Sequence, residues 1–106
     1  MKFIRTTRYE KDLKRIGATD ADHRAIVQGI ANNPLAGDVI RGLDGMRKAR
    51  FAFGGRGKSG GGRVIYFLQL DAETVLLLTA YAKNEKADLS SDDRKTLKAL
   101  LEELRK

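Results

Sequence analysis

The chain has 106 residues, 42% hydrophobic and 33% charged, which is typical of one globular domain spanning residues 1–106. With 21 Lys and Arg against 14 Asp and Glu, the net charge of +7 favours a polyanionic partner. The absence of cysteine excludes disulfides and thiol chemistry, and a single histidine, His23, argues against zinc or histidine-dyad sites. No run of about 18 apolar residues and no signal-like N-terminus is present, so we expect a cytoplasmic protein without a membrane span.

The first half of the chain is expected to form one strand and two helices. After a short strand at 2–5, Thr6 or Thr7 can cap a helix that ends at Gly17. A second helix is predicted to open at Asp20, its expected N-cap, and to close before Pro34, which supplies no N–H. Residues 35–45 hold three glycines and are interpreted as a loop.

The second half changes to strand periodicity. Residues 46–53 alternate, so Lys48 and Arg50 share one face of a predicted strand while Ala49, Phe51 and Phe53 share the other. Two further strands are predicted at 63–70 and 74–81, separated by a tight turn at 71–72.

The last strand and helix complete the expected order, β-α-α-β-β-β-α. The continuous apolar run 75–78 predicts a strand buried on both faces. A helix over 90–106 begins with Ser90 and Asp93 at capping-box spacing. Because helices and strands are segregated, the sequence predicts an α+β fold with a mainly antiparallel sheet.

Two tempting motifs are rejected. Gly55, Gly57 and Gly60 spell G-x-G-x-x-G, but a predicted strand follows them instead of the helix that a dinucleotide site requires. His23 has no second His or Cys to complete a catalytic site, so it is interpreted as a surface histidine.

Positive charge is concentrated between residues 41 and 63. This stretch has one acid, Asp44, and seven cations: Arg41, Arg47, Lys48, Arg50, Arg56, Lys58 and Arg63. Antiparallel strands can bring this cluster, together with Lys83 and Lys86, to one end and face of the sheet. Tyr66 and Tyr81 would supply rings on which bases stack. The residues alone leave RNA binding and a plain charged surface as alternatives.

The segments RKARFAFGGRGKSGGGRVIYFL and LLLTAYAKNEKADLS closely resemble the RelE/HigB toxins of bacterial toxin–antitoxin pairs, and most of all the HigB-type branch. This resemblance implies a RelE-like fold and ribosome-dependent cleavage of mRNA in the A site, with no metal or other cofactor. The 2′-hydroxyl of one nucleotide would attack the adjacent phosphate. The implied partners are a cognate antitoxin of HigA or RelB type, the ribosome and mRNA. A ParE-like gyrase poison with the same fold is the alternative.

The candidate site combines this resemblance with the charge pattern. The catalytic candidates are Lys48, Arg50, Arg63, Lys83, Lys86 and Tyr81, and the RNA-binding candidates are Arg47, Arg56, Lys58, Tyr66 and Asn84. Asn84 stands where the best-known RelE pattern has an arginine, so Lys83 or Lys86 must substitute for it. The general acid and base stay open between the lysines and tyrosines. We expect a free Arg63 guanidinium and, because of six glycines, a mobile loop over 54–62.

Overall fold

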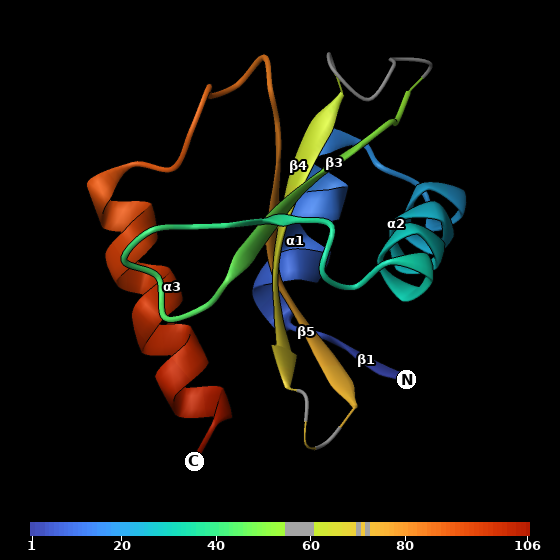
Figure 1. The fold of residues 1–106 in the computed structure, drawn as a ribbon. Coiled ribbons are helices and arrows are strands. Elements are labelled where there is room, and N and C mark those ends of the chain that lie inside the picture. The colour runs from blue at the N-terminus through green and yellow to red at the C-terminus, as the bar shows by residue number, and fades with distance from the viewer. Residues whose placement is uncertain (55–60, 70, 72) are drawn as a thin grey trace.

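A computed structural model describes residues 1–54, 61–69, 71 and 73–106. Its elements are β1 (Lys2–Arg5), α1 (Thr7–Ile16), α2 (Asp20–Asn32), β2 (Asp38–Val39), β3 (Arg47–Phe51), β4 (Gly62–Gln69), β5 (Thr74–Ala82) and α3 (Ser91–Leu104). The strands form one sheet in the order β1-β5-β4-β3-β2. In Figure 1, α3 lies on one side of this sheet and α2 on the other. The α+β class expected from the sequence is confirmed.

The sheet is mainly antiparallel, as expected, but both of its edges have features that the sequence did not predict. At one edge, β1 pairs with β5 in parallel, from Lys2 opposite Thr74 to Arg5 opposite Leu77, and the remaining pairs are antiparallel. At the other edge, β2 lies inside the stretch interpreted as a loop. A two-residue strand is too short to show a period of two, and only its pairing with β3 defines it.

Side-chain caps set the starts of all three helices. Thr6 accepts a hydrogen bond from the Tyr9 amide at 3.1 Å and so begins α1. Ser90 and Asp93 form the expected capping box at α3. The N-cap of α2 is Thr19 rather than Asp20, because the Thr19 hydroxyl accepts the hydrogen bond from the Asp22 amide. A capping box one residue earlier therefore determines where α2 begins.

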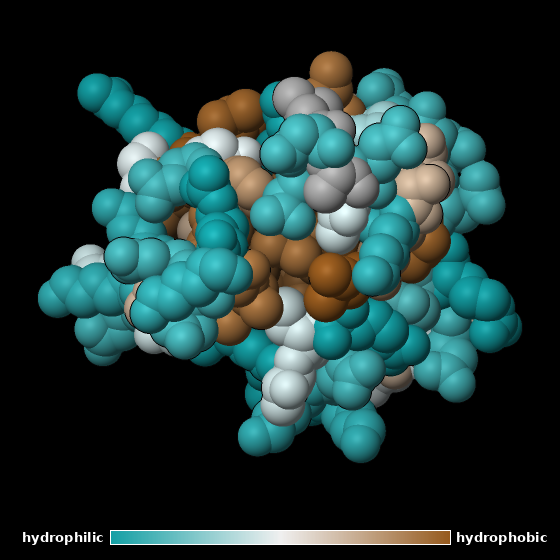
Figure 2. Space-filling model, turned by 90° about the horizontal axis from the view of Figure 1, so that it is seen from below, coloured by the Kyte–Doolittle hydropathy of each residue, from teal (hydrophilic) through white to brown (hydrophobic). Residues whose placement is uncertain are grey.

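The sheet separates two apolar clusters. The cluster under α1 and α2 includes Tyr9, Leu13, Ile26, Ile30, Phe51, Val64, Tyr66 and Leu77. The cluster under α3 includes Leu43, Met46, Ile65, Leu76, Leu78, Tyr81, Leu97 and Leu101. On the face seen from below, apolar side chains gather near the middle, with hydrophilic side chains around them (Figure 2). The strand β5 is buried along its whole length, as its apolar run predicts.

Helix α1 completes the edge of β5 where β1 stops. The Thr6 hydroxyl donates to the Leu77 carbonyl at 2.7 Å. Further along, the Asp12 carboxylate accepts from the Ala80 amide at 3.1 Å, and the Arg15 guanidinium donates to the Ala80 carbonyl at 3.2 Å. These side chains satisfy backbone groups that a longer β1 would otherwise bind. Within the described ranges, no helix has the length and apolar character needed to cross a membrane.

Candidate functional site

Three of the predicted catalytic residues form a row across the sheet. Arg50 on β3 lies opposite Arg63 on β4, and Arg63 lies opposite Tyr81 on β5. Residues directly opposite one another share a face of the sheet. Tyr81 belongs to the apolar cluster under α3, so the row lies on the α3 side. Lys48 lies two residues from Arg50 on the same face, and its Nζ is 3.5 Å from Asp88 Oδ1. We call Arg50, Arg63 and Tyr81 the cross-strand row.

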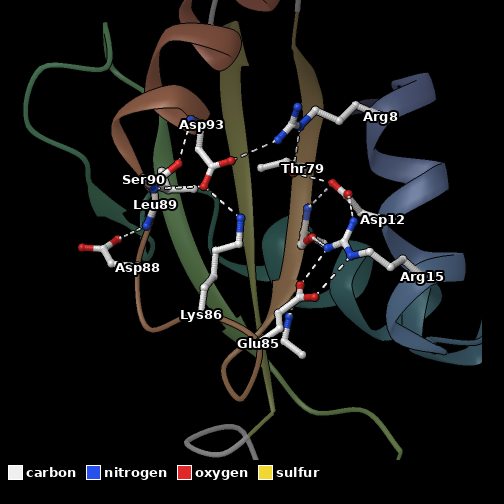
Figure 3. A network of polar contacts seen from close by, with 12 residues as sticks. Arg8, Asp12, Arg15, Thr79, Glu85, Lys86, Asp88, Leu89, Ser90 and Asp93 are labelled. Carbon is white, nitrogen blue, oxygen red and sulfur yellow. Dashed lines mark hydrogen bonds and ion pairs between the residues drawn. The ribbon is translucent and has the colours of Figure 1, made fainter.

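Lys86 adds a further cation to this face. Its Nζ lies 5.6 Å from the centroid of the Tyr81 ring, within the range of a cation–π contact. The same nitrogen donates to Asp93 Oδ2 at 2.8 Å, and Figure 3 shows the two side chains pointing toward one another. The connection between β5 and α3 therefore brings Lys86 to the end of the cross-strand row.

Arg63 is fixed instead of free. The residue is only 8% exposed, and its Nη1 donates to the Gly62 carbonyl at 3.0 Å. The physical reason is its position on β4, which has β3 on one side and β5 on the other. The expectation of an open, unconstrained guanidinium is therefore wrong. A guanidinium held in place loses less conformational entropy when it binds a ligand.

Tyr81 carries an unusual hydroxyl. The residue is 1% exposed, and within the described part of the chain its hydroxyl oxygen is the one buried side-chain polar atom without a hydrogen-bond partner. Burial first, and then the negative charge of Asp88, raise the pKa of Tyr81 to about 12, although Arg63 opposes the shift. The phenol is therefore neutral at physiological pH, and it is a hydrogen-bond donor rather than a base.

Tyr66 and Arg47 lie on the opposite face, because they pair with each other three positions, an odd number, away from the cross-strand row. Tyr66 is 1% exposed, and its hydroxyl donates to the Pro34 carbonyl at 2.7 Å and accepts from the Gly37 amide at 3.2 Å. A Cβ on Gly37 would lie 2.7 Å from that hydroxyl, so glycine permits the contact. The expectation that the Tyr66 ring is open to bases is wrong, and so is the same expectation for Tyr81, which is also 1% exposed.

Arg47 supports the same stretch of chain. Its Nη1 donates to the carbonyls of Leu35 at 3.0 Å and Gly37 at 2.8 Å. Strand alternation therefore separates Arg47 from its neighbour Lys48, although both were grouped in one basic cluster. The structure gives Arg47 a role in holding the segment before β2.

The remaining candidates lie at the margin of the site. Lys83 and Asn84 are exposed in the turn after β5. Arg56 and Lys58 lie outside the described residues, and so does most of the loop for which mobility was expected. The structure thus brings together Arg50, Arg63, Tyr81, Lys48 and Lys86, and leaves Lys83 and Asn84 beside them on the surface.

A polar network on α1 was missed by sequence reasoning. Arg15 forms a bidentate pair with Glu85, with Nη2 to Oε1 at 2.7 Å and Nε to Oε2 at 3.2 Å. It also pairs with Asp12, which is 6% exposed and accepts from the Thr79 hydroxyl (Figure 3). This network ties the turn that carries Lys86 to α1. In the sequence, the charged residues of α1 look like an ordinary solvent-exposed helix face. No periodicity indicates that the edge of β5 beyond β1 lacks a neighbouring strand.

His23 also differs from its prediction. Its Nδ1 lies 2.8 Å from the hydroxyl of Tyr9, so the ring is a partly buried partner of a core tyrosine and not a plain surface histidine. Burial lowers the pKa of His23, and nearby Arg5 lowers it further. The residue lies on α2, away from the cross-strand row.

Comparisons with known proteins show the family and the fold. Residues 1–106 match the family model described as the RelE toxin of the RelE/RelB toxin–antitoxin system. The crystal structure of the isolated E. coli RelE toxin is 17% identical, with 93% of this chain and 97% of that chain covered and a TM-score of 0.57. A free-state E. coli RelE mutant with two arginine-to-alanine substitutions is 12% identical, with coverages of 81% and 86% and a TM-score of 0.57.

At these sequence identities, structural similarity shows the fold alone. The family is shown by the family model, which matches the whole chain. Assignment to the HigB-type branch stays a prediction. The chain therefore belongs to the RelE toxin family of toxin–antitoxin systems.

Proposed function

We propose that this chain is a ribosome-dependent endoribonuclease that cuts translated mRNA in the A site and thereby inhibits translation. The observation that carries the proposal is the cross-strand row, with Lys48 and Lys86 beside it on one face of the sheet. Cations gathered next to a buried phenol suit a phosphodiester better than they suit a neutral substrate.

The proposed reaction is a transfer within the RNA strand. The 2′-oxygen of one nucleotide forms a bond to the adjacent phosphorus, and the bond from phosphorus to the next 5′-oxygen breaks. The products are a 2′,3′-cyclic phosphate and a 5′-hydroxyl end. Negative charge grows on the phosphorane oxygens, and we assign its stabilisation to Arg50 and Arg63, because guanidinium groups bind phosphate oxygens in a bidentate manner.

Two proton transfers accompany this step. The 5′-oxygen needs a proton as it leaves, and the neutral phenol of Tyr81 is suited to donate a hydrogen bond there. The 2′-hydroxyl must lose a proton, and we assign this role to Lys48 or Lys83, because Lys86 is held as an ammonium by Asp93. Each lysine lies on or beside the face that carries the cross-strand row.

Membership of a toxin–antitoxin family supports a second part of the proposal, a cognate antitoxin of HigA or RelB type that holds the toxin inactive. The place of action would be the cytoplasm, where ribosomes translate mRNA. Whether the antitoxin covers the basic face or blocks ribosome entry by its bulk can be decided with Glu substitutions at Lys48, Arg50 and Arg63. Loss of antitoxin binding in a folded triple variant would indicate that the antitoxin covers the basic face directly.

The experiment that tests the activity maps the 5′ ends of a defined mRNA incubated with the purified protein. The proposal predicts cuts at A-site codons with ribosomes present and none without them, each leaving a 5′-hydroxyl. Cuts without ribosomes would contradict ribosome dependence. Intact mRNA together with inhibited gyrase would support the ParE-like alternative, and intact mRNA with active gyrase would leave a passive RNA-binding domain.

A further inference from the structure

The ammonium of Lys86 owes its place to one carboxylate. Lys86 lies on the irregular connection between β5 and α3, and its side chain is 34% exposed. A long side chain on such a segment has many rotamers, so a specific partner is needed to fix it. Among the described residues, its Nζ contacts Asp93 Oδ2 at 2.8 Å and the face of the Tyr81 ring, whose centroid lies 5.6 Å away.

Asp93 is itself held firmly. Its side chain is 15% exposed at the start of α3, and Oδ2 accepts from the Ser90 amide at 2.9 Å. Oδ1 lies 3.6 Å from Nη2 of Arg8, which reaches across from α1 (Figure 3). Burial alone would raise the pKa of Asp93, but the hydrogen bonds from Lys86 and Ser90 hold it at about 2. The carboxylate is therefore a fixed negative charge.

The pair between Lys48 and Asp88 is different. The nitrogen and oxygen are 3.5 Å apart, and the Asp88 side chain is 67% exposed. Exposed pairs of this kind contribute little, because water competes for both charges and the side chains remain mobile. Asp88 therefore provides a matched control: it is a second acid close to a site lysine, on the same segment, without the fixed geometry of Asp93.

We propose that Asp93 is a positioning residue of this site, which holds the Lys86 ammonium over the Tyr81 ring at the end of the cross-strand row. Its effect on catalysis rests on the proposed function. Asp93 acts through Lys86 and needs no contact with RNA. A lysine released from this position would spread over many orientations, and small misplacements of a catalytic group lower rates steeply.

Asp93→Asn is the variant of choice, because an amide oxygen can still accept from Ser90 and keep the helix cap. Ser90→Ala weakens the cap and leaves the carboxylate, so it reports any effect of the helix end alone. Asp88→Asn removes the exposed acid. Lys86→Ala and the double variant with Asp93→Asn complete a double-mutant cycle.

The first readout needs no activity. A proton above an aromatic ring is shifted upfield, so the Hε resonances of Lys86 in the free protein report its position over Tyr81. We expect this shift in the wild type, Ser90→Ala and Asp88→Asn, and its loss in Asp93→Asn. Retention of the shift in Asp93→Asn would overturn the positioning role, even if the protein cleaves no RNA.

The second readout is the single-turnover rate of mRNA cleavage on ribosomes. We expect Asp93→Asn to lower the rate on the order of 10²-fold at saturating toxin, with ribosome affinity preserved and no further loss in the double variant. If the rate losses of the two single variants multiply in the double variant, Asp93 does not act through Lys86. A wild type without cleavage would refute the proposed function, while the resonance shift would still decide the placement of Lys86.

Discussion

Each face of the sheet buries a tyrosine to the same extent, but the hydroxyls of the two tyrosines differ in their hydrogen bonding. Tyr66, under α2, and Tyr81, under α3, are each 1% exposed. The Tyr66 hydroxyl binds two backbone groups, whereas the Tyr81 hydroxyl has no partner among the described residues. The neighbouring arginines follow the same division, because Arg47 binds two carbonyls on the first face and Arg50 is exposed on the second.

If the proposed function holds, this contrast separates polar groups that stabilise the fold from polar groups that act on RNA. A buried hydroxyl without a partner costs free energy, so a protein keeps one where the group serves another purpose. On the α1 and α2 face, polar side chains complete the backbone hydrogen bonding of loops and of the edge of β5. On the α3 face, cations surround a phenol that can still donate a hydrogen bond. Substitutions on the first face should therefore act on stability, and those on the second on cleavage.

The largest effect on stability is expected at Asp12. Asp12→Ala removes a buried carboxylate that accepts from the Ala80 amide and pairs with Arg15. The Ala80 amide and the Thr79 hydroxyl both lose a charged acceptor, and each such hydrogen bond typically contributes about 1.5–3 kcal/mol to the free energy of unfolding. Urea unfolding monitored by circular dichroism measures the change. Glu102→Ala, at an exposed site on α3, is the control, with an expected change within about 0.5 kcal/mol. Equal stability of the two variants would contradict the role given to α1.

The two tyrosines provide a direct comparison. Tyr66→Phe leaves the Pro34 carbonyl and the Gly37 amide without their partner, so we expect a loss of about 1–3 kcal/mol in stability. Tyr81→Phe removes a hydroxyl that has no partner among the described residues, so we expect no loss in stability but a decrease in cleavage on the order of 10²-fold. Unfolding and single-turnover cleavage are measured on both variants. The division of the two faces fails if Tyr81→Phe unfolds more easily than Tyr66→Phe.

The smallest expected effect is on the stability of the protein at acidic pH. The pKa of Asp93 falls from 3.8 to about 2 in the folded protein, so the stabilisation is complete well above pH 3.8 and is lost as the pH falls toward 2. The amount is roughly 2 kcal/mol or less. Urea unfolding between pH 6 and 2 should show a weaker pH dependence in Asp93→Asn than in the wild type. Asp88→Asn should follow the wild type, because its carboxylate is largely exposed. Parallel curves for wild type and Asp93→Asn would contradict the fixed pair.

Sequence periodicity predicted the elements that have strong local signals. The alternation of β3 placed Lys48 and Arg50 on one face, and the apolar run of β5 predicted burial on both faces, as observed. The capping box of Ser90 and Asp93 marked the start of α3. These features depend on neighbours in the chain, so they can be predicted without the fold.

The features that were missed depend on long-range contacts. The sequence shows Tyr66 and Tyr81 as equivalent aromatic residues, and only the register of β4 with its neighbours separates their faces. The sequence places Arg63 at the start of a predicted strand, but in the structure the two flanking strands bury it. The contact of Arg15 with Glu85 spans 70 positions in the chain, and no local pattern signals it. The parallel pairing of β1 has the same origin.

The central claim is that RNA cleavage belongs to the α3 face of the sheet. The most direct test compares Arg50→Gln with Arg47→Gln in single-turnover cleavage of ribosome-bound mRNA, alongside their melting temperatures. Arg50→Gln should lose about 10²–10³-fold in rate with an unchanged melting temperature, as expected for a lost stabiliser of transition-state charge. Arg47→Gln should melt earlier and cleave within about threefold of the wild type once folded, because its partners are backbone carbonyls. Equal losses of rate in both variants, or a larger loss in Arg47→Gln, would contradict the claim.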